Sequence, residues 1–168
     1  MGKFARILRH RWTDETDVAR ALDAAALMRL EERVVASERA HSGEIRLCVE
    51  AGLPLSYLWR NATARQRAVT MFGKLRVWDT EHNNGVLIYL LLADHAIEIV
   101  ADRGLTRQVP QAQWDALVVG MREAFRQRRF EAGLAQAIDA VHALLARHFP
   151  LMDGQTNPNE LPDRADLR

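Results

Sequence analysis

The chain has 168 residues and a mass of 19.1 kDa, which is the size of one domain with short tails. Hydrophobic residues make up 48% of it and charged residues 27%, which excludes an intrinsically disordered chain, and the formal charge of +1 excludes a surface that is basic throughout. The single cysteine, Cys48, excludes a disulfide framework and a cysteine-rich metal site. No apolar run approaches ~18 residues, so we expect a cytoplasmic protein that is at most peripheral to the inner membrane.

Residues 1–12 form a basic amphipathic segment ahead of the domain. Its apolar residues recur at spacings of three, four and eight, which places them on one helical face, and it contains no acid. Such a helix can lie on an anionic membrane surface, but it can also pack on its own domain or fray. The expected membrane or partner surface in this segment comprises Phe4, Arg6, Ile7, Leu8, Arg9 and Trp12.

The domain itself is expected over residues 13–149. Capping residues and early acids at 13–17 predict a helix that runs to about residue 39. Residues 44–50 alternate polar and apolar side chains, which predicts a strand with one covered face. After a turn, apolar residues at helical spacing predict a second helix over residues 57–78.

A β-hairpin is predicted in the middle of the chain. Residues 86–92 form an uninterrupted apolar run, which is typical of a central strand covered on both faces. Only the segment around Asp94 and His95 separates this run from a second one over residues 96–101. Because the connection is so short, we expect the two strands to pair as a hairpin.

Two more helices and a tail complete the chain. After a loop, helical spacing predicts one helix from Trp114 to about residue 129 and another over residues 130–148. Residues 150–168 have few apolar side chains, so we expect a disordered tail. The order helix-strand-helix-strand-strand-helix-helix contains a strand-helix-strand unit, which implies a parallel pair, and the third strand returns antiparallel. We therefore expect an α/β fold, a three-layer α/β/α sandwich with a small mixed sheet.

Several short motifs resemble those of a known family. They are Ser42-Gly43-Glu44-Ile45 at the first strand, Asn83-Asn84-Gly85-Val86 at the second, Gly104-Leu105 after the third, and Arg129-Phe130-Glu131-Ala132-Gly133-Leu134 at the last helix. In order and spacing they are similar to the TPM domain family, formerly a domain of unknown function, over about residues 14–149. The resemblance implies an α/β/α sandwich, which agrees with the expectation from the pattern of elements.

The resemblance also implies partners and a cofactor. Members include a thylakoid protein of photosystem repair, an auxiliary subunit of an animal neurotransmitter receptor, and bacterial proteins often encoded beside LemA-like membrane proteins. Many have a signal peptide and a membrane anchor, and this chain resembles the short cytosolic branch without them. A protein partner at the membrane, such as a LemA-like protein, is therefore implied. Some members bind calcium, and a plant member is credited with weak acid phosphatase activity. The resemblance therefore also implies a divalent cation such as calcium as a cofactor.

The predicted topology places polar residues at opposite ends of the sheet. Seven strand residues at ~3.4 Å each separate Asp94 in the hairpin from Asp102 after the third strand by roughly 24 Å, so these two cannot share one ion. The loop end has more oxygen ligands, and a hard cation takes several. The expected metal residues there are Asp79, Glu81 and Asp102, and the expected ligand-loop residues are Asn83, Asn84, Arg103 and Gly104.

The chain departs from the family pattern at this loop end. Many members read Gly-x-Gly-Leu-Glu followed by an Asp, whereas this chain reads Asp102-Arg103-Gly104-Leu105-Thr106, with Gln111 near the later Asp. One glycine and two acids are missing, and Arg103 adds a positive charge, which weakens metal binding. The alternative is that the loop acids are solvated charges, one of them paired with Arg103.

The second predicted helix offers another partner or lipid-headgroup surface. The chain between Glu50 and Val77 holds no acid, so this helix is basic. The expected surface residues are Arg60, Arg65, Arg67 and Lys74. A merely solvated face is the alternative interpretation.

The sequence therefore predicts a non-enzymatic accessory domain that acts with membrane-associated proteins. No catalytic constellation is recognisable, and the two basic surfaces suit a partner at the membrane or an anionic lipid surface. The alternative is a weak metal-dependent phosphohydrolase, acid-phosphatase-like, in which the loop acids hold a metal that polarises a phosphate oxygen. Nucleic acid is the least favoured partner, and binding to it through the basic helix would weaken steeply with salt.

Overall fold

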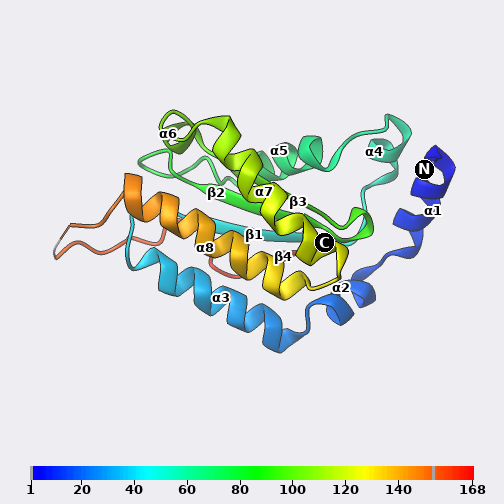
Figure 1. Cartoon of the computed structure of the whole chain (residues 1–168), viewed down its shortest axis with the longest axis horizontal. Coiled ribbons are helices and arrows are strands. Elements are labelled where there is room, and N and C mark those ends of the chain that lie inside the picture. The colour runs from blue at the N-terminus through cyan, green and yellow to red at the C-terminus, as the bar shows by residue number, and fades with distance from the viewer. Residues whose placement is uncertain (1, 153) are drawn as a thin grey trace.

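The computed structural model describes residues 2–152 and 154–168 and is a three-layer α/β/α sandwich (Figure 1). The central sheet has the strand order β3-β2-β1-β4. Its strands are β1 (Ile45–Glu50), β2 (Val86–Leu91), β3 (Ala96–Ala101) and β4 (Asp166–Leu167). β1 lies parallel to β2 and to β4, and β2 pairs antiparallel with β3. The expectation of a small mixed sheet in an α/β/α sandwich is confirmed.

Helices cover both faces of this sheet. On one face lie α3 (Ala24–Glu38), α7 (Gln111–Arg126) and α8 (Phe130–His148), and on the other lies α5 (Ala64–Lys74) (Figure 1). The shorter helices lie around the ends of the sheet. They are α1 (Lys3–Trp12), α2 (Glu15–Ala21), α4 (Leu55–Trp59), the 3-10 turn η1 (Leu92–Asp94) and α6 (Arg103–Thr106).

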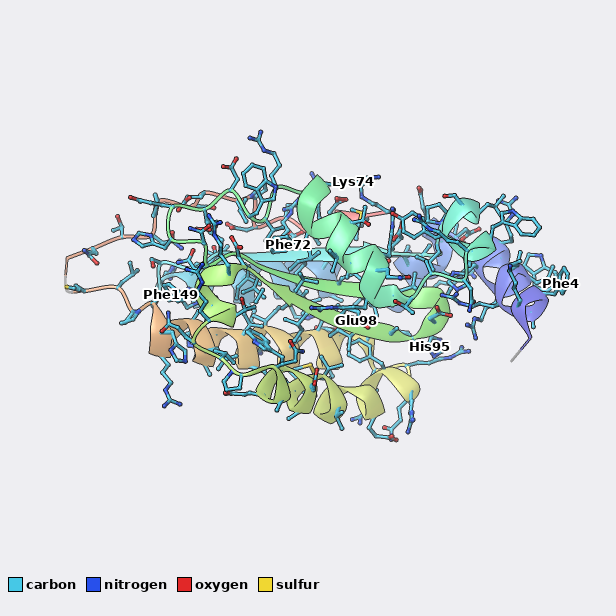
Figure 2. All side chains as sticks on the ribbon, turned by 90° about the horizontal axis from the view of Figure 1, so that it is seen from above. Phe4, Phe72, Lys74, His95, Glu98 and Phe149 are labelled. Atoms are coloured by element: carbon cyan, nitrogen blue, oxygen red, sulfur yellow. The ribbon has the colours of Figure 1, made fainter. Side chains whose placement is uncertain are left out.

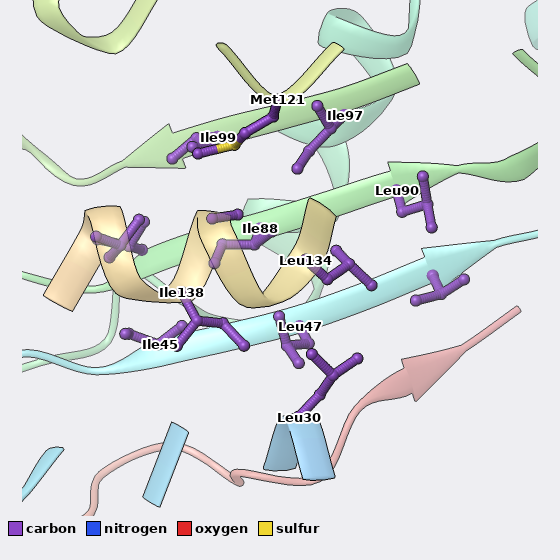
Figure 3. Packing of buried hydrophobic residues seen from close by; sticks show 14 of the residues in the cluster. Leu30, Ile45, Leu47, Ile88, Leu90, Ile97, Ile99, Met121, Leu134 and Ile138 are labelled. Atoms are coloured by element: carbon purple, nitrogen blue, oxygen red, sulfur yellow. The ribbon is translucent and has the colours of Figure 1, made fainter. Parts of the chain in front are cut away.

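The two faces of the sheet form two separate hydrophobic cores. All six residues of β2 are buried, as the continuous apolar run predicts. Alternate side chains go to opposite faces, so that Ile88 and Leu90 pack under α8 and α3, whereas Leu87 and Tyr89 pack under α5. The larger core adds side chains from β3, α7 and α8, including Ile99, Met121 and Ile138 (Figure 3).

Two of the predicted helices are each broken in two. The helix expected from residue 13 to 39 stops at Leu22, and Asp23 caps the start of α3 by accepting a hydrogen bond from the Ala26 N–H at 2.7 Å. The helix expected over 57–78 is divided into α4 and α5, because Thr63 and Gln66 form a capping box at the start of α5. In both places the apolar spacing continues across the break, so periodicity alone does not reveal it.

The expectation of a disordered tail over residues 150–168 is wrong for its described part. β4 adds to the open edge of β1, with Cys48 opposite Asp166, and the Leu161 side chain is buried in the core beneath α5. Arg46 of β1 donates hydrogen bonds to the carbonyl oxygens of Pro162 and Arg164. The tail is poor in apolar residues because backbone and polar contacts, rather than a hydrophobic face, dock most of it.

Candidate functional site

The polar groups of this protein collect at the two ends of the sheet. We call the end with the β2–β3 turn, α1 and α4 the hairpin end, and the end with the loops before β1 and β2 and after β3 the loop end. Figure 2 shows His95 and Phe4 at the hairpin end and Phe149 at the loop end. No described helix is both long enough and apolar enough to cross a membrane.

At the hairpin end, a single carboxylate anchors helix α1. Asp94 accepts hydrogen bonds from Arg6 Nε at 3.3 Å and Nη2 at 2.9 Å, and it also pairs with Arg9. Burial of the carboxyl would raise the pKa of Asp94, but the hydrogen bonds from His10 and Arg6 outweigh it and hold that pKa far below the usual value. Asp94 is therefore an ionised anchor for three side chains of α1.

His10 fixes how closely α1 approaches the sheet. Its Nδ1 accepts a hydrogen bond from the Leu53 N–H at 3.0 Å, so its Nε2 carries the proton and donates to Asp94 Oδ1 at 3.0 Å. The chain at Gly52 passes directly against α1, because a Cβ there would lie 2.6 Å from the His10 carbonyl oxygen. The helix is thus held by its polar side, with the buried His10 ring at the contact.

This docking leaves most of the apolar side of α1 uncovered. Phe4, Leu8 and Trp12 are 79%, 51% and 77% exposed, and only Ile7 packs against the core. The neighbouring α4 adds Leu55 and Trp59, and Lys3 of α1 donates to the Trp59 carbonyl oxygen at 2.7 Å. We call the five exposed apolar residues the α1–α4 surface: Phe4, Leu8, Trp12, Leu55 and Trp59.

The basic residues expected on one face of the second helix do not share a surface. Arg60 stacks on the Tyr57 ring at 4.2 Å, and Lys74 is exposed. Arg65 donates to the Ile99 carbonyl oxygen at 2.5 Å and lies 3.9 Å from Glu98. Arg67 is buried, so its assignment to an exposed partner surface is wrong.

Arg67 instead belongs to a buried polar cluster that the sequence analysis missed. Its Nε and Nη2 donate to the Glu50 carboxylate at 2.9 and 2.5 Å, and Tyr89 donates its hydroxyl proton to the same carboxylate at 2.6 Å. The hydrogen bond to Glu50 raises the pKa of Arg67, and burial together with the Glu50 charge raises the pKa of Tyr89. The cluster ties α5 to β1 and β2 and leaves no group open to a substrate.

At the loop end, the three acids expected to hold a metal have separate tasks. Asp79 pairs with Arg76 at 2.9 Å, Glu81 is exposed, and Asp102 caps α6 by accepting from the Arg103 N–H at 2.6 Å. Within residues 2–152 and 154–168, no three His, Cys, Asp or Glu side chains are placed to share an ion.

The four ligand-loop residues do lie together. Arg103 Nε donates to Asn83 Oδ1 at 2.7 Å, and the Asn84 amide donates to the Ser42 carbonyl oxygen at 3.1 Å. Gly104 is required here, because a Cβ would lie 2.5 Å from two carbonyl oxygens, those of His82 and Asn83. Two buried oxygens, Asn84 Oδ1 and Asp102 Oδ2, have no hydrogen-bond partner in the described part of the chain. These two fit a cation only in part, because calcium takes six to eight oxygen ligands and water would have to supply most of them.

Other buried titratable groups at the loop end hold the C-terminal segment. Burial raises the pKa of Glu38 to about 9, opposed by a hydrogen bond from the Ile45 N–H and reinforced by the charges of Glu44 and Asp163. Glu38 is therefore protonated at neutral pH and can donate to Asp163, whose buried Oδ1 accepts from no other described residue. Glu44 accepts a hydrogen bond from the Leu161 N–H at 3.1 Å, and burial raises its pKa as well.

One pair at this end has the geometry of a nucleophile and its base. Ser37 Oγ lies 2.8 Å from His41 Nε2, while His41 Nδ1 lies 3.0 Å from the Gly43 carbonyl oxygen. Burial lowers the pKa of His41 to about 4, so the ring is neutral. However, Ser37 is 6% exposed and His41 is fully buried, so no substrate reaches the pair. Its role is to join α3 to the loop before β1.

Comparison with known proteins gives a family model and a solved structure. The model of the TPM domain matches residues 16–144. The NMR structure of BA42 protein from the psychrophilic bacterium Bizionia argentinensis superimposes with a TM-score of 0.75 at 27% sequence identity, covering 88% of this chain and 95% of that one. The search of curated proteins found no match.

Proposed function

The chain belongs to the TPM domain family, and we propose that it is a non-enzymatic interaction domain that docks on an anionic membrane surface and acts there with membrane-associated proteins. The observation that carries the proposal is the orientation of α1. Asp94 binds the polar side of this helix, so Phe4, Leu8 and Trp12 remain half to four-fifths exposed to solvent. Three large apolar side chains on one rigidly anchored helix are an interaction surface.

The charge around these side chains favours an anionic membrane. Lys3 and Arg11 of α1 and Arg60, directly after α4, are exposed, and neither α1 nor α4 contains an acid. Lys3 also lies over the Trp59 ring at 5.6 Å, at the edge of the apolar residues. Aromatic side chains at headgroup depth with cations beside them are typical of helices that lie in the membrane interface.

The remaining polar clusters support binding rather than catalysis. The Ser37–His41 pair and the Glu50–Arg67–Tyr89 cluster are buried, and each is used to join elements of the fold. The exposed apolar surface is therefore the part of the protein that binds, and the rest of the domain holds α1 rigidly in place.

Vesicle co-sedimentation tests the lipid part of the proposal. We expect wild type to bind phosphatidylcholine vesicles that contain phosphatidylglycerol, and to bind more weakly as salt is raised. The triple substitution Phe4→Ser, Leu8→Ser and Trp12→Ser should reduce binding by at least about tenfold, because each apolar side chain contributes about 1 kcal/mol or more on burial. The control is Met28→Ser with Val35→Ser, which removes exposed apolar residues from α3. Equal binding by the two variants would contradict the proposal.

A pull-down from detergent-solubilised membranes tests the protein part. A specific membrane-associated partner, such as a LemA-like protein, should be retained by wild type and by the α3 control. A charge-reversed variant with Lys3→Glu, Arg11→Glu and Arg60→Glu should lose it. Recovery of the same proteins with the charge-reversed variant would count against an accessory role at the membrane.

The second candidate function is a weak metal-dependent phosphohydrolase at the loop end. It is favoured by the two unpartnered buried oxygens, Asn84 Oδ1 and Asp102 Oδ2. Calorimetric titration with calcium, magnesium and zinc tests it, with Asp102→Asn as the variant. Saturable binding that the variant loses, together with phosphate-ester hydrolysis that falls in parallel, would support this candidate. No binding at millimolar metal would remove it.

A further inference from the structure

We propose that the cleft at the hairpin end, between α1, α2, the β2–β3 turn and the start of α8, binds the phosphate group of a phosphate monoester. The cleft has a volume of about 500 Å³. Its charged lining is predominantly basic: Arg9, Arg20 and Arg128 line it, against one acid, Asp17, and the imidazole of His95 lines it as well. This site goes beyond the proposed function, because none of its residues belongs to the α1–α4 surface.

The cations of the cleft are not all neutralised by the protein itself. Arg20 pairs with Asp17 at 3.1 Å, and Arg9 pairs with Asp94. Arg128 has no ion pair with any described residue and is exposed. A guanidinium that is free to form two parallel hydrogen bonds matches the oxygens of a phosphate.

The field inside the cleft is positive at the position of His95. Burial lowers the pKa of His95, and the charges of Arg128 and Arg9 lower it further, opposed only by Asp94. His95 is therefore neutral and can donate one hydrogen bond. Its ring meets the Phe130 ring edge-on at a centroid distance of 5.5 Å, which fixes its orientation.

The backbone at two lining residues is held in an unfavourable conformation. His95 has φ 47° and Arg128 has φ 56°, in the left-handed region that favours glycine or asparagine. The fold could accommodate glycine at both positions more easily. Instead, both carry basic side chains that line the same cleft. Strained backbone of this kind collects where ligands are held.

The start of α8 adds a further attraction for an anion. This 19-residue helix begins at Phe130, which lines the cleft, and its N-cap residue Arg129 makes no side-chain capping bond. The first acid of the helix, Glu131, pairs with Arg29 of α3 at 2.7 Å. The N–H groups and dipole of an uncapped helix start favour a bound oxyanion, here together with the arginine side chains.

Two variants test the assignment by backbone amide NMR with inorganic phosphate at constant ionic strength. In wild type, the amide signals of residues 95 and 129–132 should shift saturably. Arg128→Asn should weaken binding at least about fivefold while the protein stays folded, because Asn adopts a positive φ readily. The control Arg126→Gln removes the same charge from the end of α7 outside the cleft and should bind phosphate like wild type. Absence of saturable shifts, or equal weakening in both variants, would overturn the proposal.

Two vesicle compositions then distinguish the source of the phosphate. Phosphatidic acid carries a phosphate monoester, and phosphatidylglycerol at matched surface charge does not. Preference for phosphatidic acid that Arg128→Asn abolishes identifies a lipid headgroup, and equal binding to both vesicles beside saturable phosphate binding identifies a free phosphate monoester. The Phe4, Leu8 and Trp12 triple variant should retain inorganic phosphate binding, so failure of membrane docking and failure of this site are distinguishable.

Discussion

The two ends of the sheet hold their docked segments with carboxyl groups in opposite protonation states. At the hairpin end, Asp94 is surrounded by Arg6, Arg9 and His10, and the hydrogen bonds from His10 and Arg6 hold its pKa far below the usual value in spite of its burial. At the loop end, Glu38 pairs with no cation among the described residues, and burial raises its pKa to about 9. A buried acid is thus ionised or neutral according to how many donors face it.

This difference predicts opposite responses to pH. The folded-state pKa of Asp94 is depressed, so its contribution to stability is present above about pH 4 and is lost only in stronger acid. The folded-state pKa of Glu38 is raised, so its contribution is present below about pH 4.5 and is lost as pH rises toward about 9. Acid should release α1 first, and alkali should release the C-terminal segment first.

The largest effect is expected inside the hairpin end. Arg67→Met removes the buried partner of Glu50, whose side chain is 5% exposed, and leaves its carboxylate uncompensated. We expect the free energy of unfolding to fall by about 3–5 kcal/mol in urea denaturation. Arg65→Met is the matched control, because Arg65 makes a half-exposed ion pair with Glu98 and should cost about 1 kcal/mol. Equal costs would mean that burial of the pair does not matter.

The loop end should show the next largest effect, through pH. Between pH 6 and pH 9, Glu38 is protonated in the folded state and ionised in the unfolded state. The free energy of unfolding of wild type should therefore fall by about 1.4 kcal/mol for each unit that the pH rises. Glu38→Gln, which is neutral throughout, should flatten this dependence. Glu32→Gln on the exposed side of the same helix should keep the wild-type slope. A flat profile in wild type would show that Glu38 is ionised.

Removal of the anchor at the hairpin end should cost about 2 kcal/mol. Asp94→Asn replaces the charged carboxylate that accepts hydrogen bonds from Arg6 and His10 with a neutral amide. Each hydrogen bond to a charged group contributes about 1.5–3 kcal/mol to stability. Hydrogen exchange should accelerate in residues 3–12 and remain unchanged in residues 160–168. Asp17→Asn breaks an exposed pair with Arg20 and weakens the capping box of α2, in which Asp17 accepts from the Asp14 N–H at 3.2 Å, but it should leave α1 protected. Acceleration at both ends would mean that the two segments are coupled.

The smallest effect is a gain in stability. Arg128→Gly should relieve the positive φ of 56° and raise the free energy of unfolding by about 0.5–1 kcal/mol. The same change at Arg126, within α7, should lower it by about 1 kcal/mol, since glycine is a poor helix former. Thermal melts that shift in opposite directions would confirm that position 128 is strained.

The first three strands and the hairpin could be predicted from the sequence almost to the residue, whereas β4 lies in the segment that was expected to be disordered. β2 covers 86–91 and β3 covers 96–101, against expected ranges of 86–92 and 96–101, because burial on both faces leaves an uninterrupted apolar run. The helix breaks were missed although their signals are local. Asp23 and the Thr63–Gln66 capping box both lie inside patterns whose apolar spacing continues.

The sites depend on contacts that no local pattern contains. Asp94 could be assigned to the hairpin, but its bonds to Arg6 and His10 join residues more than 80 positions apart. The basic helix predicted over residues 57–78 shows that sequence patterns do not reveal such contacts. The absence of acids from this stretch does not indicate which of its basic side chains is buried. Glu50, a lone acid that ends a strand beside that stretch, is the signal that could have indicated a partner for Arg67.

The late addition of β4 has a consequence for how this protein folds as it is synthesised. Cys48 pairs with Asp166, so the edge of β1 stays open on the ribosome until 118 further residues have been made. During that time β1 presents unpaired N–H and C=O groups next to a hydrophobic core, which is a template for strands of other nascent chains. Pairing of the short polar segment with β1 is therefore the last step of folding, and it protects the chain against aggregation.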